Sequence, residues 1–357
     1  MQSRALRLLL VLVVLAGAYL LLWPVPVEPV EFLPSENPGL EGPFRPNLQL
    51  AAVEHLAEGI GTGPEDVARG PDGLFYTGLL DGRIVRFGKS GGQPETFAST
   101  GGRPLGMQFD ASGNLIVADA FKGLLSISPQ GAVSLLVDQV GGQPMKFSND
   151  LDIAADGTIW FSDASQRFGV DEWMLDFLEM RPTGRLLSYH PATGRTQVHL
   201  QGLYFANGVA LSPDGAFVLV NECSAARITR LWLSGPKAGS QDVLIDRLPG
   251  YPDNLSSNGR GIFWVALPGK RLDRLESLWP RPFVRKLLVR LRGSDALPLL
   301  PYGWVIGVDA QGRVVHNLQD PQGGYATITS VNEFDGWLYP GSLTMQSVGR
   351  IAAPRGR

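Results

Sequence analysis

The chain has 357 residues, 44% of them hydrophobic, so it is long enough to bury one large core or two ordinary ones. Its formal net charge of -3 argues against a nucleic-acid-binding protein, and its single cysteine, Cys223, excludes an intrachain disulfide framework. The 44 glycines and 27 prolines exceed average usage and are typical of many short strands joined by turns.

The N-terminal stretch Ala5 to Trp23 is apolar except for Arg7, and it is long enough to cross a bilayer as a helix. Arginines before it and glutamates after it place the N-terminus in the cytoplasm. A cleaved signal peptide is the alternative, because Ala16-Gly17-Ala18 resembles a cleavage site. The apolar run continues beyond that site, which favours a membrane anchor over residues 1–23. Residues 24–47 are then expected to form a proline-rich, extended linker.

A repeated hairpin pattern begins near Glu65. Each copy has a turn of the Pro-Asp-Gly or Ala-Asp-Gly kind followed by an apolar strand. The turns fall at residues 71–73, 111–113, 155–157, 213–215, 258–261 and 335–336. Six copies, each with room for four strands, predict a six-bladed β-propeller over residues 48–353, followed by a tail at 354–357. We expect a strand over 48–53 to close the last blade. A further turn at 310–312 leaves a seven-bladed propeller as the alternative.

Two insertions interrupt the pattern with apolar residues at helical spacing. The first covers Asp171 to Glu179. The second covers Arg271 to Arg292 and is divided into two short helices by Pro280 and Pro282. Its leucines and tryptophan alternate with seven basic residues, which indicates either contact with anionic lipid or a cap over the propeller mouth.

Oxygen-bearing side chains occur just before the first strand of several repeats. The first strand of each blade lines the central channel of a propeller, so residues at equivalent strand ends converge on the axis. The converging set is Glu65, Asn149, Asn207, Asp253 and Asn254. It contains neither thiolate nor histidine, which predicts a Ca²⁺ site. The alternative is that these residues only serve turns and strand starts.

Several motifs resemble those of the calcium-dependent six-bladed propeller hydrolases, which include gluconolactonases, regucalcins and paraoxonases. They are Glu65-Asp66, Phe147-Ser148-Asn149-Asp150, Phe205-Ala206-Asn207-Gly208 and Pro252-Asp253-Asn254. The segments 182–187, 230–239 and 249–254, together with the N-terminal anchor, resemble the strictosidine synthase-like, or adipocyte plasma membrane-associated protein-like, branch. The resemblance covers residues 50–353 and the anchor.

The resemblance implies roles for individual residues. The five converging residues match the ligands of a catalytic calcium, and Asp66 and Asp150 match ligands of a second, structural calcium. Asp253 matches the proposed general base of gluconolactonases. A histidine found in paraoxonases is missing from the matching segment 103–107. Strictosidine synthases proper lack this metal set, which argues against their condensation chemistry here.

These observations predict a calcium-dependent hydrolase of esters or lactones, with Asn207 and Asp253 as catalytic residues. Calcium would polarise the substrate carbonyl, and a carboxylate would accept the proton of the attacking water. The propeller is expected on the periplasmic, lumenal or extracellular side of the membrane, with a small-molecule substrate and no nucleic acid. A membrane-tethered propeller that binds a partner, with calcium only structural, is the alternative.

Overall fold

The computed structural model describes residues 2–293 and 300–354, so Arg355 to Arg357 of the predicted tail lie outside the described residues. The chain divides into two compact units. The helical unit comprises Met1–Pro34, Glu172–Arg181 and Leu272–Pro298, and the propeller unit comprises the remaining residues.

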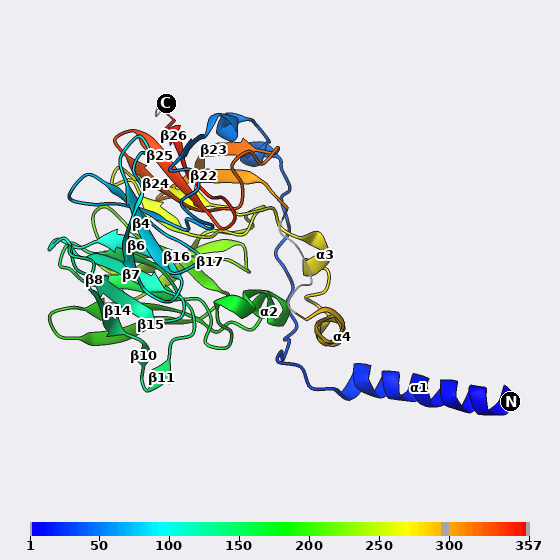
Figure 1. The fold of residues 1–357 in the computed structure, drawn as a ribbon. Helices are drawn as coiled ribbons and strands as arrows, with labels where there is room; N and C mark the ends of the chain where they lie inside the picture. Colours follow the sequence, from blue (N-terminus) through cyan, green and yellow to red (C-terminus); the bar gives the residue numbers. More distant parts are fainter. Residues whose placement is uncertain (1, 294–299, 355–357) are drawn as a thin grey trace. The chain divides into compact units, whose positions relative to one another are not determined.

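The propeller unit contains six four-stranded antiparallel sheets within the described residues, which confirms the predicted six-bladed β-propeller (Figure 1). The strands of each blade are given from the innermost outwards. Blade one contains β2 (Val67–Arg69), β3 (Phe75–Gly78), β4 (Arg83–Phe87) and β5 (Glu95–Ser99), and blade two contains β6 (Pro104–Phe109), β7 (Leu115–Asp119), β8 (Gly123–Ile127) and β9 (Val133–Val137). Blade three contains β12 (Ser148–Ile153), β13 (Ile159–Asp163), β14 (Gly184–His190) and β15 (Arg195–Leu203).

The other three blades repeat this arrangement. Blade four contains β16 (Ala206–Leu211), β17 (Phe217–Glu222), β18 (Arg227–Trp232) and β19 (Gln241–Ile245), and blade five contains β20 (Leu255–Ser257), β21 (Ile262–Ala266), β22 (Gly303–Asp309) and β23 (Val314–Asp320). Blade six contains β24 (Ile328–Phe334), β25 (Trp337–Ser342), β26 (Val348–Ala352) and β1 (Glu54–Leu56). The turn at 310–312 joins β22 to β23 inside blade five, so it starts no seventh blade. A separate small hairpin pairs β10 (Gln139–Val140) with β11 (Gln143–Pro144).

The last blade is closed by the N-terminal strand β1, which pairs with β26 in the register Glu54↔Arg350. The strand predicted over 48–53 is therefore placed several residues too early. Gln49–Ala52 instead forms a 3-10 helix, whose Leu50 is 1% exposed and packs with Trp264 and Ile328 of blades five and six. The apolar residues that suggested a strand thus fill the space between two blades.

The hairpins form as their turn chemistry predicts. In blade four, Gly215 has φ +67°, a conformation that favours glycine, and its N–H donates to the carbonyl of Ser212 at 2.9 Å. The Asp214 carboxylate accepts from the N–H of Ala216 and from the Ser212 hydroxyl. These bonds fix the register in which Val209 faces Val220.

The hydrophobic core lies between neighbouring blades. Val209 and Val218 of blade four pack with Trp160 and Leu186 of blade three, for example. Similar clusters join blades one and two, two and three, five and six, and six and one. Each blade therefore buries both faces of its sheet, and together the blades hold the six inner strands in a ring.

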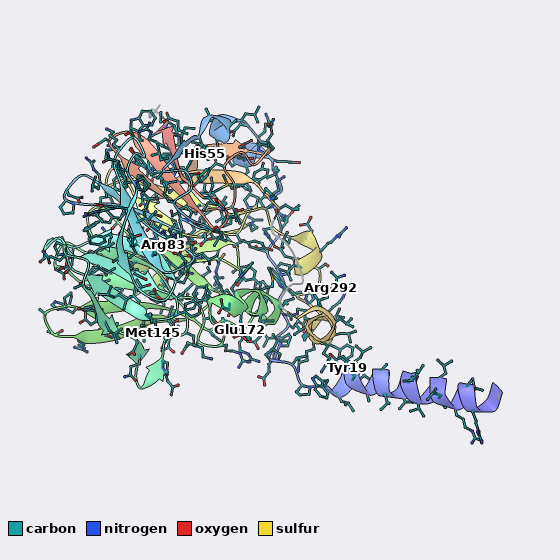
Figure 2. The ribbon with its side chains drawn as sticks, viewed as in Figure 1. Tyr19, His55, Arg83, Met145, Glu172 and Arg292 are labelled. Atoms are coloured by element: carbon teal, nitrogen blue, oxygen red, sulfur yellow. The ribbon has the colours of Figure 1, made fainter. Side chains whose placement is uncertain are left out.

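The helical unit contains α1 (Gln2–Leu22), α2 (Trp173–Glu179), α3 (Asp273–Glu276) and α4 (Pro282–Arg292), with the extended chain that follows α1. Both predicted insertions are thus helical, and the second is divided at its prolines as expected. The segment Arg4–Leu22 of α1 has a mean hydropathy of 2.6 and no buried residues, so it is long and apolar enough to span a membrane. Figure 2 shows its side chains projecting along the whole helix.

Candidate metal centre

The six inner strands β2, β6, β12, β16, β20 and β24 are neighbours in a closed ring. They surround a cavity of about 290 Å³ that is lined by residues from every one of them. The ends of these strands are therefore the place where side chains from different blades meet.

Four inner strands carry a β-bulge close to their first residue. The pairing register shifts between 104 and 107 in β6, 148 and 151 in β12, 206 and 209 in β16, and 328 and 331 in β24. A bulge places two residues opposite one and redirects their side chains. Asn149 and Asp150 are consequently both released from the regular ladder, as are Asn207 and Gly208.

The five predicted ligands are all buried in the structure. Glu65, Asn149, Asn207 and Asn254 are each 3% exposed, and Asp253 is 9% exposed. Asn149 and Asn207 lie in the bulges of adjacent inner strands, Glu65 precedes β2, and Asp253 and Asn254 precede β20. Four blades thus contribute oxygen atoms to this end of the ring, as the repeat register predicted.

Hydrogen bonds connect most of this set. The Asn207 Nδ2 donates to Asp253 Oδ1, and the Asn221 side chain donates to the Asp253 carbonyl. Thr329 joins two others, because its hydroxyl donates to the Glu65 carbonyl at 2.8 Å and its own carbonyl accepts from the Asn254 N–H at 2.9 Å. These bonds place the Asn207 and Asp253 side chains in contact and hold the backbones of Glu65 and Asn254 to Thr329.

Three amide oxygens in this set have no hydrogen-bond partner among the described residues: the buried Oδ1 atoms of Asn149, Asn207 and Asn254. A buried oxygen without a partner costs about 1–3 kcal/mol. Three such atoms on neighbouring inner strands, together with two carboxylates, form a set that fits a cation with several oxygen ligands.

The electrostatics of the two carboxyl groups agree with this interpretation. Burial raises the pKa of Glu65 to about 7, against the attraction of Arg103. Burial and repulsion by Glu65 raise the pKa of Asp253 well above its usual range. Arg103 compensates the charge of Glu65, whereas Asp253 is buried without a cationic partner among the described residues, and a divalent cation would supply the positive charge that two ionised carboxylates require.

Calcium is the cation that these residues fit best. Among the described residues no group of three or more histidine, cysteine, aspartate and glutamate side chains could hold a metal ion, and only two of the five predicted ligands, Glu65 and Asp253, are of these types. An all-oxygen set with two carboxylates suits Ca²⁺ and disfavours zinc. The residues that would hold it are Glu65, Asn149, Asn207, Asp253 and Asn254.

Asp66 and Asp150 meet on the wall of the central cavity, where repulsion by Asp66 contributes to raising the pKa of Asp150. Each carboxylate also joins neighbouring blades. Asp66 accepts from the Met107 N–H at 3.0 Å, and Asp150 accepts from the Val209 N–H at 2.8 Å. The structural calcium implied by the resemblance stays a prediction, since these hydrogen bonds alone account for both side chains.

Three functional candidates were missed in the sequence. Arg103 is 3% exposed, and its Nη2 lies 2.9 Å from Glu65 Oε2. The Asn221 side chain donates to the Asp253 carbonyl. Thr329 forms hydrogen bonds with the backbones of Glu65 and Asn254. Arg103 and Thr329 occupy the strand-start register in blades two and six, so that register was the signal that could have found them. Asn221 ends a middle strand, where the repeat gives no such signal.

The four histidines do not belong to this site. His55, His190, His199 and His316 lie in β1, β14, β15 and β23, which are third or fourth strands of their blades. His199 Nε2 contacts the Ser188 hydroxyl, and His316 stacks on Trp264. A proton acceptor at the site must therefore come from its carboxylates.

Fold and site define a six-bladed propeller with a ring of buried oxygen donors at the start of its inner strands. A family model described as strictosidine synthase matches residues 149–236, and one described as strictosidine synthase-like, N-terminal, matches residues 42–87. The adipocyte plasma membrane-associated protein of Rattus norvegicus is 36% identical over 95% of this chain and 96% of its own length. The chain therefore belongs to the strictosidine synthase-like family that includes the adipocyte plasma membrane-associated proteins.

Solved structures share the fold at low sequence identity. A gluconolactonase of Xanthomonas campestris has a TM-score of 0.62 and 16% identity, covering 84% of this chain and 89% of that protein. A calcium-binding protein, regucalcin, of Agrobacterium tumefaciens has a TM-score of 0.57 and 14% identity, covering 85% and 93%.

Proposed function

We propose that this protein is a membrane-anchored, calcium-dependent hydrolase of carboxylic esters or lactones. The observation that carries the proposal is the set of three buried, unpartnered amide oxygens beside two carboxylates whose pKa values are raised. The structures that share the fold include a gluconolactonase and the calcium-binding protein regucalcin, and these neighbours support the same proposal. The apolar helix α1 and the membrane-associated relatives support the anchor. We place the propeller on the non-cytoplasmic side because arginines precede the apolar segment and glutamates follow it.

Calcium bound by the five residues would supply a Lewis acid for the substrate carbonyl and for the negative charge that develops on its oxygen. Asp253 is the residue that would accept the proton of the attacking water. Asn207 donates to Asp253 Oδ1, which orients the carboxylate and leaves its other oxygen for the proton. Asn221 holds the backbone of Asp253 by its carbonyl.

The experiment is hydrolysis of phenyl acetate and of simple lactones by the purified full chain with calcium. Asp253→Asn keeps an oxygen ligand but cannot accept a proton at neutral pH. It should retain much of the calcium-induced rise in unfolding temperature and lose turnover by ~10²–10⁴-fold. Glu65→Gln and Asn207→Ala should lose turnover together with calcium affinity, since each weakens the ligand set. Asp156→Asn, at an exposed turn, is the matched control and should change neither property.

Two results would contradict the proposal. Full activity of Asp253→Asn would show that Asp253 is not the base. Calcium binding by the unchanged chain without turnover of any substrate would assign the propeller to partner binding.

A further inference from the structure

Helix α4 presents three of its apolar residues to solvent. Phe283 is 56% exposed, Val284 37% and Leu291 63%, whereas the two α4 residues that are buried are Arg285 and Val289. The exposed residues recur at the helical spacing, so they share one face of the helix. A surface helix of a soluble protein has the opposite arrangement.

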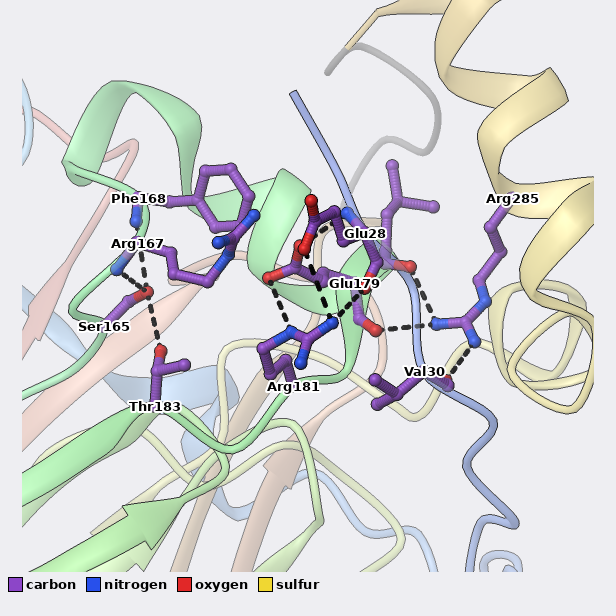
Figure 3. Close-up of polar contacts among 10 residues, drawn as sticks. Glu28, Val30, Ser165, Arg167, Phe168, Glu179, Arg181, Thr183 and Arg285 are labelled. Carbon is purple, nitrogen blue, oxygen red and sulfur yellow. Dashed lines mark hydrogen bonds and ion pairs between the residues drawn. The ribbon is translucent and has the colours of Figure 1, made fainter. Parts of the chain in front are cut away.

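The buried face of α4 is fixed within the helical unit by Arg285. Its guanidinium donates to the carbonyls of Leu178, Glu179 and Val30 (Figure 3). It also donates to the carbonyl of Trp279. Burial lowers the pKa of Arg285 to about 10, which leaves it charged at neutral pH. Because one side chain joins α4 to α2 and to the chain after α1, the helix cannot rotate to bury its apolar face.

The same helix is bonded to the end of α1. The Tyr19 hydroxyl donates to the Arg290 carbonyl at 3.2 Å, and the Arg290 Nε donates to the Trp23 carbonyl at 2.7 Å. Figure 2 labels Tyr19 on α1. Tyr19 and Trp23 lie at the end of the apolar span, where aromatic side chains mark the membrane–water interface. In a membrane spanned by α1, these two bonds would hold the C-terminal part of α4 near the lipid headgroups.

Charge along α4 is of one sign. The helix contains four basic residues and no acidic residue, and of these only Arg285 is buried. No described residue forms an ion pair with Lys286 or Arg292. Exposed cations beside an exposed apolar face complement a surface of anionic headgroups over acyl chains.

We propose that α4 lies in the interface of an anionic membrane, with Phe283, Val284 and Leu291 inserted and Lys286 and Arg292 at the headgroups. The contact is continuous with the α1 anchor and gives the helical unit a second attachment to the bilayer. It is independent of the proposed hydrolase activity.

The test uses the full chain in lipid nanodiscs, with an environment-sensitive fluorophore on a cysteine introduced by Leu291→Cys. Ala192→Cys, in an exposed propeller turn, is the control label. The unchanged chain, whose Cys223 is buried, is the labelling blank. The Leu291 label should be quenched by nitroxide-bearing lipid and protected from aqueous iodide at least several-fold relative to the Ala192 label. Equal iodide access at both positions, with no lipid quenching, would overturn the proposal.

The charge requirement is tested with the same label in nanodiscs of phosphatidylcholine alone and with phosphatidylglycerol added. Insertion should be stronger with the anionic lipid, and Lys286→Glu combined with Arg292→Glu should abolish that difference. Lys122→Glu combined with Arg195→Glu makes the same charge change at exposed propeller positions and should leave the difference intact. An anionic-lipid dependence that survives the α4 reversal would overturn the assignment of the cations.

Discussion

At the scale of single residues, Arg103 is the unexpected member of the site. Its guanidinium lies 2.9 Å from Glu65 Oε2 and also donates to the Gly63 carbonyl. A fixed positive charge on a metal ligand competes with a metal ion for that carboxylate. We therefore predict that Arg103 stabilises the metal-free protein and would weaken the binding of calcium at this site.

Replacing Arg103 by methionine should tighten calcium binding by about tenfold or more, since the competing charge is removed. The metal-free protein should become less stable, because Glu65 then lacks its partner. Isothermal titration calorimetry and thermal unfolding with and without calcium measure the two effects. Arg185→Met removes the partner of Asp163 from a similarly buried ion pair and is the control. It should lower stability without changing the affinity for calcium. Unchanged or weaker calcium binding by Arg103→Met would show that Arg103 does not compete.

The raised pKa of Glu65 predicts a pH dependence for the metal-free protein. The folded state holds the Glu65 proton up to about pH 7, whereas the unfolded chain releases it near 4.5. The free energy of unfolding contributed by this group is therefore highest at low pH and falls as the pH rises from 4.5 through 7. The unfolding temperature should fall by several degrees over this window without calcium and remain flatter with calcium, which replaces the proton. Glu65→Gln should remove the part of this decrease that Glu65 contributes. If the unfolding temperature of that variant depended on pH to the same extent, the assignment of the decrease to Glu65 would be refuted.

Much of the site could be predicted because its residues follow a repeat. The register before each inner strand predicted that Glu65, Asn149, Asn207, Asp253 and Asn254 converge on the axis; all five are buried in the structure, and Asn207 contacts Asp253. The ion pair of Arg103 with Glu65 depends on the distance between blades one and two, and no local sequence pattern gives that distance. Asn221 was missed for a similar reason, because it reaches Asp253 across blades from a middle strand.

At the scale of elements, the bulge of β16 requires a glycine beside the site. A Cβ added to Gly208 would lie 2.4 Å from the Leu255 nitrogen and 2.6 Å from the Asp253 carbonyl oxygen. β16 can therefore approach β20 closely only with glycine at this position. The hairpin turns were predictable from their sequences, but the bulges were not, since they arise where the ring closes.

Gly208→Ala should lower stability by about 1–3 kcal/mol and weaken calcium binding, because the Asp253 backbone must move. Gly88→Ala is the matched control, since a Cβ there would meet no atom closer than 3.8 Å. Chemical denaturation and calcium titration of both variants provide the measurement. A Gly208→Ala protein with unchanged stability and affinity would mean that the strands separate without cost.

The exact position of the strand that closes blade six could not be predicted from the sequence either. The segment 48–53 is apolar enough for a strand, but tertiary packing places Leu50 between blades five and six and leaves the pairing to Glu54–Leu56. Hydrophobic pattern predicts that a segment is buried more reliably than it predicts which segment pairs with an edge.

At the scale of the whole molecule, α1 predicts that the protein remains with the membrane. The full chain should stay in the membrane fraction after washing with high salt and with carbonate, because about nineteen apolar residues are removed from water. N-terminal sequencing of the recovered chain provides the second readout. A soluble chain beginning near Tyr19 would show that the segment is a cleaved signal.

The most direct measurement of the central claim is the rate of phenyl acetate and lactone hydrolysis as a function of free calcium. The full chain should be inactive with a calcium chelator, regain its activity when calcium is restored, and reach saturation at the calcium concentration that saturates binding in calorimetry. A hydrolysis rate that does not change between chelator and saturating calcium would contradict the account.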